Sequence, residues 1–151
     1  LGHGLGIACG MAYLYKKQKS DKKVYVIISE GELYEGSTWE ALLFAAHHNL
    51  HNLNVIIDEN SLIILGKTDD CLRLDPVIDK IKGFGFDVSQ VDGHNLKELE
   101  NAFNNNKNKT NIILAKTIKG KGFSLMENKA HWHYWNSMSS NEIEICRKEL
   151  N

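Results

Sequence analysis

The sequence predicts an α/β domain with three layers, in which helices cover a mostly parallel central sheet. Three observations favour this fold class: short continuous runs of β-branched residues, amphipathic segments that alternate with them, and an ordinary globular composition. The 151 residues are 42% hydrophobic and 25% charged, which is typical of a chain that buries one sizeable core. Alternation of strand and helix is typical of a parallel sheet with helices packed on its faces.

Three segments are expected to form buried strands, and a fourth is a weaker candidate. The three are residues 24–28 (VYVII), 54–58 (NVIID) and 111–115 (NIILA), and the weaker one is residues 87–91 (DVSQV). Their apolar positions are continuous rather than alternating, which indicates strands that are covered on both faces.

The segments around these strands are expected to form helices. Residues 4–19 are rich in Ala and Leu and end in lysines, which favour a helix C-terminus. Ser37 and Glu40 have the spacing of a capping box, so a second helix is expected to begin there. Pro76 suits the first position of a third helix, and Asn95 suits the start of a fourth.

The fourth helix is expected to bury one face, and the chain is expected to end in a further helix. Leu96, Leu99 and Phe103 share one face at helical spacing. From Ser140 the sequence SNEIEICRKEL is typical of a helix that the chain cuts short.

Charge and cysteine content exclude several classes of protein. Lys and Arg number 18 and Asp and Glu 19, so no basic excess points to nucleic acid or to an anionic membrane. The apolar runs are too short to cross a bilayer. Cys9, Cys71 and Cys146 form no CxxC pair, which argues against a disulfide framework or a zinc site and favours a reducing, cytoplasmic setting. Because Leu1 opens a glycine-rich segment, we expect the N-terminus of a longer protein to be missing.

Two loops that follow predicted strands carry residues suited to a diphosphate and a cation. One loop is SEGE at residues 29–32, and the other is ENSL at residues 59–62. In parallel sheets ligands bind beyond the carboxyl ends of the strands. A carboxylate and an amide oxygen there can share Mg²⁺ or Ca²⁺, which prefer oxygen ligands. Gly31 allows the backbone to approach a diphosphate closely.

These loops resemble the thiamine diphosphate motif, in which GDG is followed at a similar spacing by NN. The wider sequence resembles the transketolase family. LGHGLGIACGMA is similar to that family's LGQGL segment, and SEGELYEGSTWEALLFAAHHNLHNLNVIID to its GDGELxEGxxWEA region. FGFDVSQVDGHN and AKTIKGKGFSLMENKAHWHY resemble two further family segments. The resemblance extends from Leu1 to about Tyr134.

The resemblance implies a role for individual residues. Metal ligands are implied at Glu30, at Asn60 and at the backbone carbonyl of Leu62. Contacts to the cofactor are implied for Leu1, Gly2, Gly31, the N–H of Glu32, Asn60 and Ile64. Catalytic or substrate-side roles are implied for Lys119 and His133, and positions near a dimer interface for Glu35 and Glu40.

The resemblance also implies the function. It implies transfer of a two-carbon ketol unit between sugar phosphates, as in the pentose phosphate pathway, with thiamine diphosphate and Mg²⁺ or Ca²⁺ as cofactors. Residues 1–151 resemble only the diphosphate-binding domain, so the chain is expected to need a pyrimidine-binding, C-terminal domain or subunit. The expected assembly is a homodimer or a heterotetramer. One alternative is a 1-deoxyxylulose-5-phosphate synthase-like enzyme, although EGSTWEA fits transketolase better. The other is a non-catalytic domain that retains the fold.

Three departures from the family motif concern the two loops. Glu30 replaces Asp, which keeps the charge but moves the carboxylate by one methylene, and Mg²⁺ is strict about geometry. Ser29 replaces the first glycine, and Glu59 replaces the first asparagine. The Glu30 departure is the one that bears on metal affinity.

Simpler interpretations stand beside the functional ones. LGHGLG can be a tight junction of loop and helix rather than a nucleotide-binding loop. His47 and His51 share a helix face but lack a third zinc ligand, which favours surface histidines. Residues 131–135 can form a packed aromatic patch. Glu32 and Glu35 can be acids favoured by a helix N-terminus.

Overall fold

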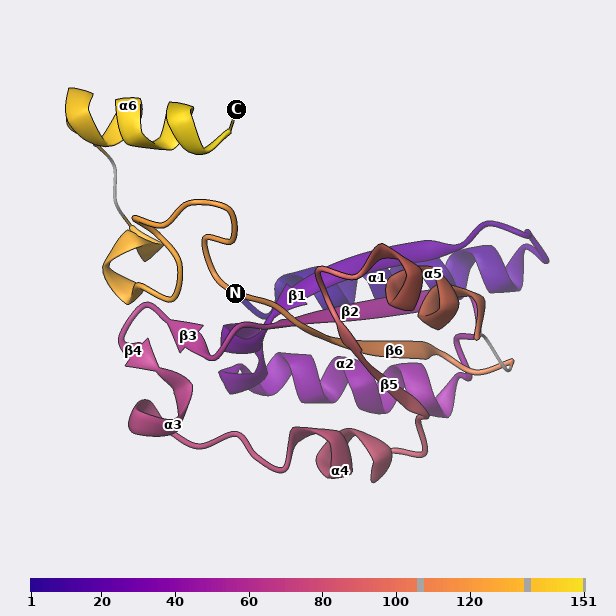
Figure 1. Cartoon of the computed structure of the whole chain (residues 1–151). Helices are drawn as coiled ribbons and strands as arrows, with labels where there is room; N and C mark the ends of the chain where they lie inside the picture. Colours follow the sequence, from indigo (N-terminus) through magenta and orange to yellow (C-terminus); the bar gives the residue numbers. More distant parts are fainter. Residues whose placement is uncertain (106–107, 135–136, 151) are drawn as a thin grey trace.

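A four-stranded parallel sheet forms the centre of the computed structural model, which describes residues 1–105, 108–134 and 137–150. The strands are β1 (Val24–Ser29), β2 (Leu53–Glu59), β5 (Val88–Asp92) and β6 (Asn111–Lys116). Their order across the sheet is β1-β2-β6-β5, and every neighbouring pair is parallel (Figure 1). The predicted fold class and the four predicted strands are confirmed.

Helices and short elements connect these strands. The helices are α1 (His3–Lys17), α2 (Gly36–His47), α3 (Thr68–Cys71), α4 (Val77–Lys82), α5 (Leu96–Asn104) and α6 (Ser140–Glu149). Two 3-10 helices, η1 (Glu30–Tyr34) and η2 (Ala130–His133), and a hairpin of β3 (Leu62–Ile63) and β4 (Gly66–Lys67) complete the fold. Figure 1 shows α6 set apart from the sheet, beyond the long loop that follows β6.

Helices pack on both faces of the sheet, which gives the three layers. On one face α1, α2 and α4 share a core with alternate residues of the strands. This core includes Leu5 of α1, Leu42 of α2, Ile57 of β2 and Ile112 of β6. Because successive strand side chains point to opposite faces, residues such as Ile113 are buried on the other side. There α5 packs against β5 and β6.

The outer strand β1 is covered on one face only, contrary to the prediction that all strands are covered on both. Tyr25 and Ile27 are 57% and 74% exposed, whereas Val24 and Ile28 lie in the core. The rings of Tyr25 and of Phe103 on α5 meet edge to face with their centroids 5.9 Å apart, which shields only one end of the strand. A continuous apolar run therefore does not by itself establish that both faces are covered within the same chain.

Helix starts agree with the predictions where the signal is local. Asn95 caps α5 by accepting hydrogen bonds from the N–H groups of Lys97 and Glu98, and α6 begins at Ser140 as predicted. Leu96 is 82% exposed, so the prediction that it belongs to the buried face of α5 is wrong.

Two predicted helix starts differ in detail. The capping box predicted at Ser37 and Glu40 is absent, because α2 begins at Gly36 and the Ser37 hydroxyl donates to the carbonyl of Gly2 at 3.0 Å. Pro76 is the N-cap of α4 rather than its first residue.

The cysteines among the described residues are free thiols, with Cys9 and Cys146 buried and Cys71 exposed. Burial raises the pKa of the Cys9 thiol to about 11. No helix in the described part of the chain is both long and apolar enough to span a membrane. Trp135, the last residue of the predicted aromatic patch, lies outside the described residues.

Candidate active site

A cavity of about 420 Å³ lies where the loops after β1, β2 and β6 meet. Seven residues that the sequence predicted as site residues line it together, although they come from five separate segments of the chain. These seven are Leu1, Gly31, Asn60, Leu62, Ile64, Lys119 and His133. The position agrees with the rule that parallel sheets bind ligands beyond their carboxyl ends.

The turn that follows β1 is held in shape by its own side chains. Ser29 and Glu32 form a capping box at the start of η1, in which the Glu32 carboxylate accepts from the Ser29 N–H at 3.1 Å. The Glu32 N–H, which was predicted to face a diphosphate, donates to the Ser29 side chain. Glu32 also accepts from the N–H of Gly2 at 3.2 Å. Gly2 and Glu32 therefore join the N-terminal loop to the turn.

Glu30 reaches directly to the loop that carries Asn60. Its side chain is buried, with 7% of its surface exposed, and its Oε2 accepts from the backbone N–H of Ser61 at 2.8 Å. Asn60 is fixed in turn, since its Nδ2 donates to Asp58 at 3.1 Å and its Oδ1 accepts from the N–H of Leu62 at 3.1 Å. The two predicted metal-ligand loops thus touch each other.

The donors at this contact are suited to a hard cation. Glu30 contributes a carboxylate and Asn60 an amide oxygen, and oxygen ligands are what Mg²⁺ and Ca²⁺ prefer. In the described part of the chain no group of three or more His, Cys, Asp or Glu side chains could hold a metal ion. A cation here therefore needs the Asn60 oxygen, a backbone carbonyl and oxygens from a bound ligand. Nor do the described residues offer a third ligand for the zinc alternative at His47 and His51.

Gly31 lies where little space remains for a side chain. A Cβ atom at this position would stand 3.3 Å from the Ile63 side chain and 3.5 Å from the Ser29 hydroxyl. The backbone is therefore the surface that Gly31 offers to the cavity, as expected for a close approach to a ligand.

Glu59 is a feature of the site that the sequence analysis treated only as a departure from the motif. Burial raises the pKa of its carboxyl group, Lys116 opposes that change, and Glu30 adds to it. Its Oε2 is buried and has no hydrogen-bond partner among the residues that the structure describes. The carboxylates of Glu30 and Glu59 therefore repel each other at the ends of β1 and β2, which favours a positive charge nearby.

The outer wall of the cavity comes from a segment in which the sequence analysis identified only Leu62 and Ile64. This wall is the β3–β4 hairpin with α3, residues 62–72, and it adds Ile63, Leu65, Cys71 and Leu72 to the lining. No motif pointed to these four residues, because their place at the cavity depends on contacts with distant parts of the chain.

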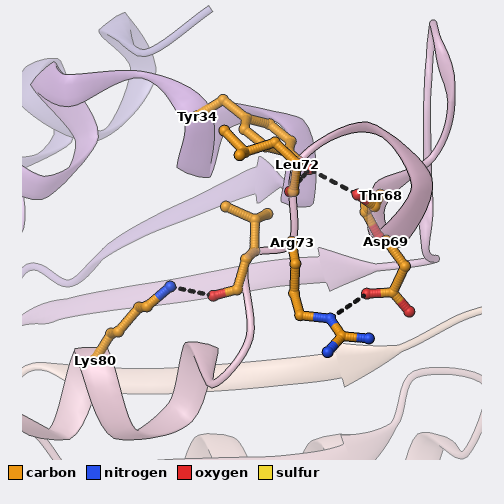
Figure 2. Close-up of polar contacts among 7 residues, drawn as sticks. Tyr34, Thr68, Asp69, Leu72, Arg73 and Lys80 are labelled. Carbon is orange, nitrogen blue, oxygen red and sulfur yellow. Dashed lines mark hydrogen bonds and ion pairs between the residues drawn. The ribbon is translucent and has the colours of Figure 1, made fainter.

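Tyr34 at the end of η1 ties this wall to the turn that carries Glu30 and Gly31. Its hydroxyl donates to the carbonyl of Leu72 at 2.7 Å and lies 3.4 Å from the carbonyl of Thr68 (Figure 2). Arg73 pairs with Asp69 at 3.5 Å beside this contact. Further along, the Lys80 ammonium donates to the carbonyl of Leu74, also drawn in Figure 2.

Lys119 and His133 face the cavity from the loop after β6 and from η2. Burial lowers the pKa of the His133 imidazole, and the nearby Lys119 ammonium lowers it further. A neutral imidazole can accept a proton through one ring nitrogen and donate through the other.

The two predicted interface acids have different surroundings. Glu35 is the N-cap residue of α2 and lines the cavity, whereas Glu40 is exposed on α2. Glu35 therefore belongs to the wall of the cavity, whereas Glu40 belongs to the outer surface of α2.

The comparisons with known proteins agree on one family. The family described as "Transketolase, thiamine diphosphate binding domain" matches residues 1–151. One of the subunits of apulose-4-phosphate transketolase from Actinobacillus succinogenes is 38% identical over 152 residues, which is 99% of this chain and 55% of that protein. Human transketolase is 42% identical over 137 residues, which is 88% of this chain and 22% of that protein. The chain thus spans about half of the first relative and less than a quarter of the second.

Solved structures show the same relationship. Transketolase from Campylobacter jejuni superimposes with a TM-score of 0.91 at 28% identity, covering 99% of this chain and 25% of that one. Transketolase from Pichia stipitis in complex with sedoheptulose 7-phosphate gives a TM-score of 0.81 at 26% identity, covering 98% and 23% of the two chains.

Proposed function

Because the chain belongs to the family of transketolase thiamine diphosphate binding domains, we propose that its cavity binds the diphosphate of that cofactor within a larger transketolase assembly. The observation that carries the proposal is the meeting of seven motif residues from five segments in one cavity of about 420 Å³. In this proposal residues 1–151 form the diphosphate-binding domain, and a pyrimidine-binding domain is supplied by another part of the assembly.

The proposed cation is Mg²⁺, with Ca²⁺ as a substitute. Its ligands are the Glu30 carboxylate, the Asn60 amide oxygen, the Leu62 carbonyl and oxygens of the diphosphate. Support comes from the hydrogen bond between Glu30 and the N–H of Ser61, which brings the two loops together. The carboxyl groups of Glu30 and Glu59 also influence each other here, since Glu30 adds to the burial that raises the pKa of Glu59. A divalent cation between the carboxylates and the diphosphate offsets their negative charge.

The proposed reaction is transfer of a two-carbon ketol unit between sugar phosphates. When bound, thiamine diphosphate supplies the nucleophilic carbon that carries this unit. Gly31 offers backbone to the diphosphate, while Leu1, Gly2 and Ile64 border the rings of the cofactor. These residues orient the group and exclude water from it.

His133 and Lys119 act on the substrate side in this proposal. The neutral His133 imidazole holds or releases a proton at a sugar hydroxyl, and its lowered pKa keeps it neutral at physiological pH. The Lys119 ammonium attracts the phosphates of cofactor or substrate. The corresponding biological setting is sugar-phosphate metabolism, the pentose phosphate pathway, in the cytoplasm, where free thiols such as Cys71 persist.

Assembly with a partner is part of the proposal, because the cavity is bordered by exposed apolar side chains. Leu1, Leu65 and Leu72 are 79%, 80% and 66% exposed, and Ile64 is 51% exposed. Exposed apolar groups around a cavity mark a surface that another polypeptide covers. We propose that a pyrimidine-binding domain or subunit covers it, in a homodimer or heterotetramer. Glu35 and Glu40 are placed near the interface in this arrangement.

Calorimetric titration of thiamine diphosphate tests the proposal. The protein is titrated with and without Mg²⁺, alone and together with a pyrimidine-binding transketolase subunit. We expect binding that requires the metal and that tightens in the presence of the subunit. Asn60→Ala should remove the metal dependence, whereas Asn101→Ala on the exposed side of α5 should not. If neither metal nor subunit produces binding, the fold serves a non-catalytic role in this protein.

A further inference from the structure

The sequence Asp92-Gly93-His94 packs against the start of the loop that carries Lys119. Asp92 is the last residue of β5 and pairs with Lys116, the last residue of β6. Directly after this pair, the N–H of Gly93 donates to the carbonyl of Lys116 at 2.7 Å. The β5–α5 loop therefore begins in contact with the chain that leads into the candidate site.

Gly93 allows this close packing because it has no side chain. A Cβ atom at Gly93 would lie 2.5 Å from the Thr117 side chain, 3.0 Å from the carbonyl of Lys116 and 3.2 Å from the Ala115 side chain. Contacts as short as the first do not occur between real atoms of this kind. Any larger residue must displace Thr117, whose hydroxyl contacts the Asp58 carboxylate at the cavity.

His94 makes the next contact with the segment that follows β6. Its Nε2 accepts a hydrogen bond from the backbone N–H of Ile118 at 2.8 Å. His94 is itself fixed, since its N–H donates to the Asp92 carboxylate at 2.9 Å. The N–H of Thr117 donates to the carbonyl of Glu59 at 3.0 Å. Consecutive backbone groups are thus held up to the residue directly before Lys119.

We propose that His94 is a positioning residue for Lys119, and that it acts by accepting the Ile118 N–H. The inference rests on the proposed function in one respect, namely that Lys119 faces a bound phosphate. A ring nitrogen that accepts a hydrogen bond carries no proton, so the imidazole is neutral with its proton on Nδ1. A protonated imidazole has no acceptor, and the Ile118 N–H then loses its partner.

Charged groups on each neighbouring element surround this contact. Asp92 lies on the same loop, and Glu98 of α5 accepts from the Asp92 N–H at 2.9 Å. Lys116 and Lys119 lie on the β6 side, which His94 meets. Acids and lysines act in opposite directions on a charged imidazole.

The test compares two substitutions of His94. His94→Gln places an amide oxygen near the position of Nε2, accepts the Ile118 N–H and does not titrate. His94→Phe keeps a ring but has no acceptor. His51→Gln, at the turn between α2 and β2, is the matched control for loss of an imidazole. The readouts are the amide resonances of Ile118 and Lys119 at one fixed pH, and the dissociation constant of thiamine diphosphate with Mg²⁺.

In His94→Gln the Ile118 and Lys119 amide resonances should stay close to their positions in the unmodified protein, because the acceptor is kept, and cofactor affinity should stay within about 2-fold. In His94→Phe both resonances should move, and cofactor affinity should fall by about 2- to 10-fold, as expected for one hydrogen bond.

Failure of this inference differs from failure of the proposed function. If His94→Phe binds the cofactor as tightly as the unmodified protein, His94 does not position Lys119, although the cofactor site stands. If no form binds the cofactor, the resonances alone decide: an unmoved Lys119 amide in His94→Phe overturns the inference, and a moved one supports it. If His94→Phe does not fold, His94→Gln decides: cofactor affinity within about 2-fold supports the inference, and a larger loss despite the retained acceptor overturns it.

Discussion

Replacing Glu30 by Asp should lower the stability of the protein and tighten its binding of cofactor. Glu30 is 7% exposed and accepts from the Ser61 N–H at 2.8 Å. Removing one methylene withdraws the carboxylate by about 1.5 Å, which takes it out of hydrogen-bonding range. Loss of a hydrogen bond to a charged group costs about 1.5–3 kcal/mol. Relief of a strained Mg²⁺ ligand should tighten thiamine diphosphate by about 1–2 kcal/mol, or about 5- to 30-fold.

The assay measures both quantities on the same protein samples. Urea denaturation without ligand gives the free energy of unfolding, and calorimetry gives the cofactor dissociation constant with Mg²⁺ and with Ca²⁺. Since Ca²⁺ accepts looser geometry, the gain from Glu30→Asp should be smaller with Ca²⁺ than with Mg²⁺. Glu100→Asp is the control, because the Glu100 side chain is 59% exposed and pairs with Lys97 at the surface of α5. It should change neither quantity appreciably.

Glu30→Ala separates the structural contact from the metal contact. It leaves the Ser61 N–H without its partner, so stability should fall as in the Asp variant, but metal-dependent binding should be nearly lost. An alanine variant that binds as well as the unmodified protein would show that Glu30 is not a metal ligand. An aspartate variant that gains no affinity would show that the Ser61 contact already places the Glu30 carboxylate well, which refutes the geometric reasoning.

Three further measurements test the site and the core. Tyr34→Phe removes the hydrogen bond to Leu72, so it should lower the free energy of unfolding by about 1 kcal/mol and speed amide exchange in residues 68–72. Unchanged exchange would show that the outer wall of the cavity does not depend on Tyr34. NMR titration should place the pKa of His133 below 6.5, and Lys119→Met should raise it. Because unfolded His133 binds a proton more readily, its contribution to stability is present above pH 6.5 and declines as the pH falls toward the folded pKa; an unshifted titration contradicts this. Ile57→Ala should lower the free energy of unfolding by about 2–5 kcal/mol, measured by denaturation, since Ile57 is fully buried. A smaller loss would show that the core closes around the space that the side chain leaves.

The sheet and its ligand loops could be predicted because their signals are local. Runs such as VYVII have few stable alternatives to a buried strand, and Asn95 caps α5 through N–H groups two and three residues away. The Glu30 and Asn60 loops could be assigned to one edge because parallel strands present their carboxyl ends together. The hydrogen bond from Ser61 to Glu30 is a consequence of that geometry.

Features that depend on distant contacts could not be predicted. Ser37 has the sequence of a helix cap, but its hydroxyl donates to Gly2, which lies 35 residues away. Tyr34 reaches Leu72 across 38 residues, and Ile118 reaches His94 across 24. In each of these hydrogen bonds one partner is a backbone group, which every residue type offers, so the sequence does not identify it.

Contacts within the chain hold the candidate cofactor site together before any ligand binds. Glu32 ties Gly2 to the turn after β1, Glu30 ties that turn to Ser61, and the Thr117 N–H ties the Lys119 loop to Glu59. A site that is already ordered loses less conformational entropy when it binds a ligand. The Ile64 and Leu65 side chains, in contrast, remain exposed at the cavity mouth. We therefore expect association with a pyrimidine-binding partner, rather than ordering of these loops, to limit cofactor affinity in the protein.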